Sequence, residues 1–453
     1  MRWIIGIVAL LGLALVLQAG LVAFAGYVLL GVFLLSRFLA REWIANLSAE
    51  RECDRAPKEV GESVEVVVRV RNSGKWPIAW VLVEDMLPEP ALRAKPAKLT
   101  ARGSRIRVMF LPAGKAKPVK YRLTFDSRGY FPVGPCVAET GDVFGLHRRH
   151  RLLAPPVYVM VYPKVLPLGG YDFASERPIG EVRLANRLFE DPTRTAGVRP
   201  YQLGDPLQRV HWRATARTGV LHSRVYEPTS LAGATVLVDF HADGYPKRGE
   251  PYRSDLAVTT ACSIANAVVL LNQQIGFASN GRDAAERIKA EALEAEEAGA
   301  EHATRFATRE RFEQKDNTDR LRPVTVDTRR GYDQFQQIRE ALARLELTDA
   351  MTFSSLILEV GPRLPRDATV VCVLPRVPVE TAVALGQLRR QGFAISALLI
   401  GLTDEEERAV AAGRLAAEGV RDVRFVNSEQ ELSALGDRGR AAPPEYQIAA
   451  ALA

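Results

Sequence analysis

The stretch ATVLVDFHADG, residues 234–244, decides the fold of the C-terminal half of the chain. It begins with an unbroken apolar run and ends in polar residues, which is the pattern of a strand buried on both faces of its sheet. Helical and strand-like segments then alternate, with helices expected at 255–274, 332–347, 379–392 and 404–419 and strands at 275–279, 368–375, 393–401 and 420–426. This alternation predicts an α/β domain with a doubly wound parallel sheet over residues 233–436.

Two segments of this half depart from the alternation. Residues 283–317 are rich in Ala, Glu and Arg and have little apolar periodicity, which predicts a solvated helix or a partly disordered insertion. Residues 437–453 are predicted to form a flexible tail. The helix expected at 332–347, in contrast, has a clear apolar face made of Phe335, Ile338, Leu342 and Leu345.

Toward the N-terminus, residues 45–165 follow a period of two. The segment SVEVVVRVRN, residues 63–72, alternates apolar and polar positions as a half-buried strand does. Further strands are expected at 79–88, 104–112, 119–131 and 155–163, with Gly, Pro and Asn between them. Several short strands at regular spacing predict an immunoglobulin-like β-sandwich. The glycine-rich stretch 127–149 is interpreted as turns, and a binding role for Asp142 or His147 is the weaker alternative.

The first 44 residues are predicted to form a transmembrane hairpin. Residues 3–36 carry no charge, and a single helix of that length would be longer than a hydrocarbon core of about 30 Å. Two passes, near 3–17 and 21–36, fit better than one tilted helix or a signal peptide. Arg2, Arg37, Arg41 and Arg51 flank the pair, so the positive-inside rule places the rest of the chain in the cytoplasm, whereas a single pass would place it outside.

Composition sets further limits. The 453 residues are 47% hydrophobic and 25% charged with a net charge of +7, which indicates two or three folded domains that lie near anionic lipid. No nucleic-acid-binding motif is present, so no nucleic acid partner is predicted. The four cysteines contain no C-x-x-C pair, so a zinc site is disfavoured and a reducing compartment is preferred to a Cys53–Cys136 disulfide.

The stretch GVRPYQLGDPLQRVHWRATARTGVLHSRVYEP, residues 197–228, is the densest in polar side chains. One interpretation is an enzyme, a hydrolase in which Asp205 orients His211 as a general base. No nucleophile elbow or phosphate loop accompanies the pair, which disfavours that interpretation. A second is an anion or nucleic-acid patch, in which five arginines bind phosphate while Tyr201 and Trp212 stack on bases.

We favour a third interpretation, in which this stretch is structural and docks a partner. It belongs to a segment, residues 166–232, that connects the two domains and would fix their relative orientation. Gly204 and Asp205 suit a turn, and Asp205 is expected to accept hydrogen bonds from Arg199, Arg209 or Arg217. Trp212 is expected to bury a large surface. The remaining arginines are then free to bind another protein.

Several separated motifs of the chain resemble those of the domain of unknown function 58 family. In this sequence they are Gly197-Val198-Arg199-Pro200-Tyr201, Leu203-Gly204-Asp205, Arg209-Val210-His211-Trp212 and Ala216-Arg217, with Arg128-Gly129-Tyr130 and Gly141-Asp142-Val143-Phe144-Gly145-Leu146 upstream. The resemblance extends over the whole chain and includes the strand that carries Asp239. It implies a von Willebrand factor A-like α/β domain. It also implies partners, namely a MoxR-type AAA+ ATPase and related von Willebrand A-like or transglutaminase-like membrane proteins. The implied role is an adaptor or assembly factor in envelope or protein-complex maturation, and the resemblance names no reaction. We expect a scaffold or adaptor rather than an enzyme.

Von Willebrand A domains bind Mg²⁺ through an Asp-x-Ser-x-Ser loop, a threonine and a second aspartate. Here His241 and Asp243 replace the two serines after Asp239, Thr348 or Thr352 is the candidate threonine, and Pro375-Arg376 stands where the second aspartate is expected. A metal-dependent binding module that uses Asp239, His241 and Asp243 is therefore an alternative, since imidazole and carboxylate suit a transition metal. A domain without a cofactor is the preferred expectation.

Overall fold

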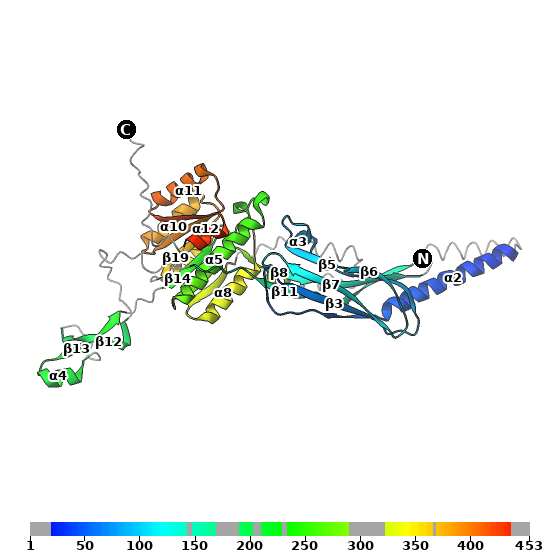
Figure 1. Ribbon diagram of the computed structural model, residues 1–453, viewed down its shortest axis with the longest axis horizontal. Coiled ribbons are helices and arrows are strands. Elements are labelled where there is room, and N and C mark those ends of the chain that lie inside the picture. The colour runs from blue at the N-terminus through cyan, green and yellow to red at the C-terminus, as the bar shows by residue number, and fades with distance from the viewer. Residues whose placement is uncertain are drawn as a thin grey trace.

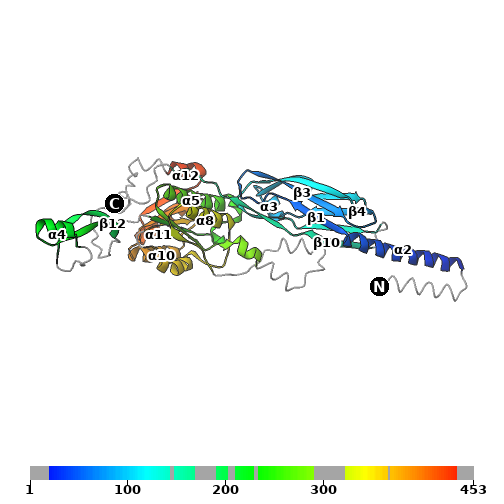
Figure 2. The same ribbon diagram turned by 90° about the horizontal axis from the view of Figure 1, so that it is seen from below.

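The computed structural model describes residues 20–142, 147–168, 190–202, 210–228, 233–289, 322–365 and 368–435. These residues form a long helix, a β-sandwich, an α/β domain and a small arm. Figures 1 and 2 show them in a row, with helix α2 at one end of the molecule and the arm at the other. The helix and the arm therefore lie on opposite sides of the two larger domains.

Helix α2, Gly20–Ala45, is the helix among the described residues that is long and apolar enough to cross a membrane. The second predicted pass falls within it, but α2 continues beyond Ser36 because its last part packs on the sandwich through Phe33, Ala40 and Trp43. Arg151 Nη1 donates to the Ala45 carbonyl at 2.8 Å and so caps the helix end. The first predicted pass, and with it the hairpin, lies outside the described residues.

The β-sandwich consists of two four-stranded antiparallel sheets with a smaller sheet at one end. The first has the order β1 (Leu47–Glu52), β3 (Ser63–Asn72), β7 (Ala116–Phe125) and β5 (Leu99–Gly103). The second has the order β10 (Arg148–Ala154), β9 (Cys136–Gly141), β4 (Ile78–Asp85) and β6 (Ile106–Leu111). The third contains β2 (Lys58–Glu59), β11 (Val157–Tyr162) and β8 (Gly129–Val133), and α3 is Glu89–Arg93.

Alternate residues of these strands fill one core. In β3 the burial alternates strictly, and Val66 and Val68 are fully buried together with Leu123 of β7. The period-two prediction is therefore confirmed. The glycine-rich stretch is more than turns, because β8, β9 and the start of β10 lie in it. All four cysteines are free, and burial raises the pKa of Cys136 to about 12.

The α/β domain is built on one six-stranded sheet. Its order is β17 (Val324–Arg329), β15 (Gln274–Ser279), β14 (Gly233–Val238), β19 (Ala368–Leu374), β20 (Ile395–Ile400) and β21 (Asp422–Val426). All neighbours are parallel except β15 and β17, which are antiparallel. The prediction of a purely parallel sheet is wrong at this edge, where a half-exposed antiparallel strand ends a parallel sheet, as is common in large sheets.

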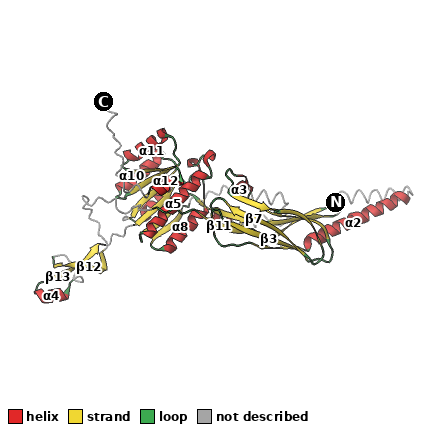
Figure 3. Ribbon diagram, viewed as in Figure 1, coloured by secondary structure: helices red, strands yellow, loops and turns green. Residues whose placement is uncertain are grey.

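Helices cover both faces of this sheet (Figure 3). They are α5 (Tyr252–Leu270), α8 (Tyr332–Arg344), α9 (Phe353–Val360), α10 (Val379–Arg390), α11 (Glu405–Ala417) and α12 (Glu429–Ala434), with the short elements η2 (Ala242–Gly244), η3 (Lys247–Gly249), η5 (Gly361–Arg363), β16 (Arg282–Asp283) and β18 (Leu345–Glu346). Val236 of β14 faces the core with α5 and α8, whereas Leu237 faces the core with α9, α10 and α11. The sheet is thus doubly wound, and the predicted apolar face of α8 is buried.

Candidate partner-docking site

The arm contains the part of residues 197–228 that the structure describes. Strand β12 (Glu190–Pro200) pairs with β13 (His222–Pro228), and the two-turn helix α4 (Trp212–Thr218) precedes β13. The Tyr201 amide donates to the Leu221 carbonyl at 2.8 Å, and Val210 bridges to Ser223. Helix α4 ends at Gly219, whose φ of 73° is left-handed and favours glycine. Backbone hydrogen bonds within the arm therefore hold β12, β13 and α4 together.

His211 is the N-cap of α4. Its Nδ1 accepts a hydrogen bond from the Ala214 amide at 3.0 Å, which satisfies one of the amides that the first turn of a helix leaves free. Because Nδ1 accepts, the neutral ring carries its proton on Nε2. The ring thus has a structural role in the arm; a structural role was predicted for this stretch, but helix capping by His211 was not. A short polar side chain at this position would meet the same need.

Trp212 is 70% exposed, and the expectation that it buries a large surface is wrong. The physical reason is that α4 contains no buried residue, since the two strands of the arm are too small to cover it. Val198, Val220 and Leu221 are also large apolar residues that the arm exposes. The arginines of α4, Arg213 and Arg217, are exposed as well. The arm therefore exposes a tryptophan and arginines, residue types that are enriched in binding hot spots, together with apolar side chains.

The predicted pairing around Asp205 falls on residues outside the described part of the chain, as do Gly204 and Arg209. Arg199 is half-buried, and its Nη1 donates to the Pro200 carbonyl at 3.3 Å. Of the predicted docking residues, the structure brings Arg199, Tyr201, His211, Trp212 and Arg217 into the arm.

The connecting segment, residues 166–232, was expected to fix the relative orientation of the two domains; its residues 169–189, 203–209 and 229–232 lie outside the described part of the chain, so this stays a prediction. Among the described residues, Arg128, directly before β8, makes a contact between the sandwich and the α/β domain. Its Nε lies 3.2 Å from Asp255 Oδ1 of α5, and its Nη1 donates to the carbonyls of Leu342 and Leu345 at 3.0 and 2.8 Å. A second pair, Arg339 with Glu59, lies at 2.6 Å. The orientation of the two domains is thus fixed by β8, α5 and α8.

The carboxyl end of β14 is the place where open α/β sheets bind ligands, because the chain turns to opposite sides of the sheet there. Asp239 is 3% exposed, and its Oδ1 accepts from Asn280 Nδ2 at 2.9 Å and from the His241 amide at 3.2 Å. Burial raises the pKa of Asp239, and the bond from Asn280 opposes this. Asn280 was not predicted, although it directly follows β15 as Asp239 follows β14.

The three candidate metal ligands are not gathered around one point. Asp243 is 64% exposed on its side chain and pairs with Arg376 at 3.2 Å, so a cation already lies beside it. Among the residues that the structure describes, no group of three His, Cys, Asp or Glu side chains is placed to hold a metal ion. The prediction of a metal at Asp239, His241 and Asp243 therefore gains no support from this part of the chain.

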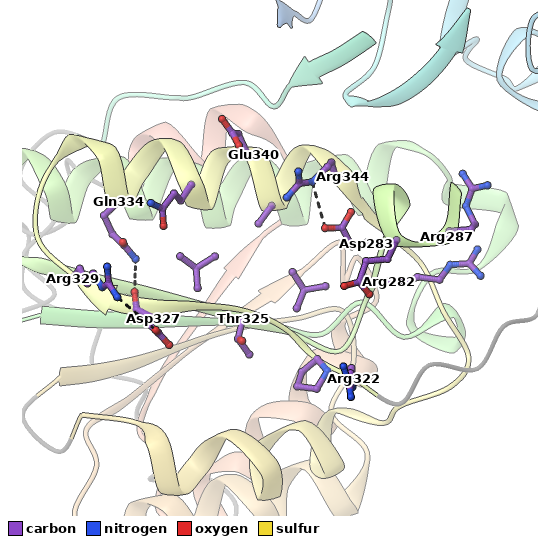
Figure 4. Close-up of a pocket in the computed structure, with 16 residues that line it drawn as sticks. Arg282, Asp283, Arg287, Arg322, Thr325, Asp327, Arg329, Gln334, Glu340 and Arg344 are labelled. Carbon is purple, nitrogen blue, oxygen red and sulfur yellow. Dashed lines mark hydrogen bonds and ion pairs between the residues drawn. The ribbon is translucent and has the colours of Figure 1, made fainter. Parts of the chain in front are cut away.

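A cleft of about 600 Å³ lies between the edge strand β17 and helix α8 (Figure 4). Its lining carries many charges, but four of its five arginines, Arg282, Arg287, Arg329 and Arg344, lie within 4.0 Å of an acidic group. Arg344 lies 3.4 Å from Asp283, and Arg287 lies 2.8 Å from Glu346. The cleft is consequently lined by a network of ion pairs, and neither sign of charge dominates it.

Taken together, the fold defines a class of proteins in which an apolar helix carries a β-sandwich and a mostly parallel α/β domain. Residues 197–316 match the family described as "Protein of unknown function DUF58", so the chain carries a DUF58 family domain. The chain is also a distant homologue of YeaD of Bacillus subtilis (strain 168), described as uncharacterized. The two are 25% identical over 270 residues, which cover 59% of this chain and 64% of YeaD, just under two thirds of its length.

Solved structures resemble about a quarter of the chain. A CARDB domain from Pyrococcus furiosus, in complex with di-metal ions, is 14% identical and covers 25% of this chain and 91% of its own, with a TM-score of 0.18. A PapD-like domain of human CEP192 is 16% identical and covers 25% of this chain and 83% of its own, also with a TM-score of 0.18. Likeness this slight adds nothing to the strand pairings described above.

Proposed function

We propose that this protein is a membrane-anchored scaffold or adaptor whose arm docks a MoxR-type AAA+ ATPase during envelope or protein-complex assembly. The observation that carries the proposal is the arm itself, on which Trp212, Val198, Val220 and Leu221 are all exposed. Apolar side chains of this size are rarely gathered on a small projection unless another protein covers them. The resemblance of the sequence motifs to the DUF58 family supplies the class of partner.

Helix α2 supports the anchoring. Its 26 residues would rise about 39 Å, which exceeds a hydrocarbon core of about 30 Å. Large apolar side chains such as Phe24 and Leu29 are exposed on it, as lipid contact requires. With a preceding pass in residues 3–17, the soluble part would be cytoplasmic, where an ATPase has access to it. Reaction of single surface cysteines with a membrane-impermeant reagent in intact cells tests this orientation.

The α/β domain is proposed to be of the von Willebrand A type, with the carboxyl edge of its sheet used for protein contacts. Two features support this proposal. The doubly wound sheet places Asp239 and Asn280 at that edge, and Arg128 brings the sandwich against Phe240, whose ring lies 5.3 Å from the guanidinium. The carboxyl edge of the α/β sheet is thereby in contact with the β-sandwich, which follows α2 in the chain.

The docking role is tested by co-purification from detergent-solubilised membranes. The full chain is compared with a Trp212→Ala, Arg213→Glu, Arg217→Glu variant, with ATP present or absent. The matched control carries Tyr332→Ala, Arg329→Glu and Arg330→Glu, because these residues are also exposed and basic or aromatic but lie on the α/β domain. The AAA+ ATPase should be recovered with the wild type and the control and lost with the arm variant. Equal recovery with all three proteins would refute docking by the arm.

A further inference from the structure

The end of the sandwich from which α2 leaves is basic and aromatic. Trp76 is 56% exposed in the loop before β4, and Phe110 is 52% exposed near the end of β6. Lys117 Nζ lies 5.9 Å from the centre of the Phe110 ring. Lys75 and Lys115 are exposed in the adjoining loops. We call these five residues, Lys75, Trp76, Phe110, Lys115 and Lys117, the proximal surface.

The loops of the proximal surface are held in place by one buried side chain. Asn72 is 1% exposed, and its Nδ2 donates to the Trp76 carbonyl at 2.9 Å and to the Pro112 carbonyl at 3.3 Å. Its Oδ1 accepts from the Gly74 amide at 2.9 Å. The loop 73–77 and the hairpin between β6 and β7 are thus fixed together. The exposed side chains on them are presented by a rigid base, which lowers the entropy lost on binding.

The same end of the sandwich contacts the chain of α2 at two places, just after the end of the helix and about ten residues earlier along it. The Ser73 amide donates to the Asn46 carbonyl at 2.9 Å, directly after the helix. Farther along, His147 Nδ1 lies 2.9 Å from Ser36 Oγ, and the His147 ring packs edge-on against Phe33 at 4.7 Å. The large apolar side chains exposed on α2 begin at Phe38, between these two contacts along the chain, and continue to Leu21. Lipid around that part of α2 would therefore end close to the proximal surface (Figure 1).

The charge at this end is suited to an anionic surface. Arg37 and Arg41 of α2 add to the three lysines. The acidic groups nearby are engaged within the protein: Glu42 accepts from Asn46 at 2.8 Å, Glu139 lies 3.7 Å from Arg148, and the Asp142 carboxylate accepts from the His147 amide at 2.6 Å. These three carboxylates keep their charge, but the five basic groups outnumber them, so this end carries an excess of positive charge.

We propose that the proximal surface rests on the headgroups of anionic phospholipid beside α2 and so sets the height and tilt of the soluble part above the bilayer. Tryptophan prefers the membrane–water interface, and lysines near an anionic leaflet are attracted to it. This inference rests on the proposed membrane anchoring by α2. It adds a second, electrostatic contact that is separate from the helix.

The test uses the full chain with Cys53→Ser in vesicles that contain a doxyl-labelled quencher lipid. A fluorophore is attached at Ala113→Cys in the β6–β7 hairpin, at Leu29→Cys on α2, or at Ala216→Cys in the arm, all exposed positions. Vesicles contain phosphatidylcholine alone or with phosphatidylglycerol. A Lys75→Glu, Lys115→Glu, Lys117→Glu variant is compared with a Lys95→Glu, Arg102→Glu, Arg122→Glu control that changes the charge equally on other exposed parts of the sandwich.

We expect the label at position 113 to be quenched in vesicles with phosphatidylglycerol. Most of that quenching should be lost in the Lys75, Lys115, Lys117 variant and in phosphatidylcholine alone, and kept in the control. The label at 29 should be quenched throughout and the label at 216 never. If 29 is quenched but 113 is not, the lipid contact is refuted, a protein partner is left for this surface, and the anchoring stands. If neither is quenched, both the contact and the anchoring fail. If the label at 113 is quenched equally in the wild type and in the Lys75, Lys115, Lys117 variant, the proposed binding to anionic headgroups is refuted.

Discussion

Arg128, which directly precedes β8, and Asp255 of α5 lie 3.2 Å apart at the junction of the sandwich and the α/β domain. The Arg128 side chain is 8% exposed, and burial lowers its pKa while Asp255 and then Glu250 oppose that effect. The guanidinium also donates to two carbonyls at the end of α8, where the helix dipole favours a positive charge. One side chain thus links β8 to the helices on one face of the sheet.

Replacement of Arg128 by alanine should destabilise the full chain by about 3 kcal/mol, because it leaves two carbonyls and a carboxylate without their buried partner. Chemical denaturation in detergent, followed by circular dichroism, measures this. The comparison is Glu59→Gln, which removes the more exposed Arg339–Glu59 pair and should cost less than about 1 kcal/mol. Equal effects of the two substitutions would mean that Arg128 is not the central contact.

His211→Ala should fray the start of α4, since the loss of an N-cap costs about 1 kcal/mol. Hydrogen exchange at the Ala214 amide would report it as lost protection. His211→Ser offers a new cap and should restore the protection, whereas a catalytic histidine would not be replaced by serine. If the His211→Ser and His211→Ala variants exchange alike, the capping role of His211 is wrong.

Trp212→Ala should leave the free energy of unfolding within about 0.5 kcal/mol of the wild type, because the side chain is already in solvent. Partner binding should nevertheless fall by more than about tenfold if Trp212 is a hot spot. A denaturation curve and a binding titration with the purified ATPase measure the two effects separately. A large loss of stability would show that Trp212 supports the fold of the arm instead.

Asp239→Asn keeps an acceptor for Asn280 and for the His241 amide while removing a buried charge. Burial raises the pKa of folded Asp239 above its unfolded value of about 3.9. The folded protein therefore gains stability from the protonated acid below the unfolded pKa, and loses it as the pH rises through the folded pKa.

The variant should consequently gain stability over the wild type as the pH rises above about 4, by about 1.4 kcal/mol for each unit by which the pKa is raised. Denaturation at a series of pH values tests this, with the exposed Asp243→Asn as control. A variant that is less stable at neutral pH, in a manner abolished by chelator, would instead indicate that Asp239 holds a cation.

The sequence predicted those features that depend on local periodicity. The alternation in residues 63–72 and the apolar face of α8 identified a sandwich and a doubly wound sheet, because both patterns report burial directly. Strand β17 was missed, although VTVDTR alternates, because it follows the long charged segment. The environment of Trp212 could not be predicted, since its exposure depends on how few neighbours the arm provides. Arg128 was noted only as part of the Arg128-Gly129-Tyr130 motif. Its contact with the α/β domain could not be predicted, because the Leu342 carbonyl to which it donates is 214 residues away along the chain.

Photo-crosslinking can show whether the arm docks an AAA+ ATPase. A photoreactive phenylalanine is placed at position 212 in the full chain within native membranes, and at position 332 on α8, an equally accessible aromatic position, as control. Docking by the arm should give a crosslink from position 212 to the MoxR-type ATPase, identified by mass spectrometry, and none from position 332. Absence of that ATPase from the products at 212, or the same products from both positions, would contradict it.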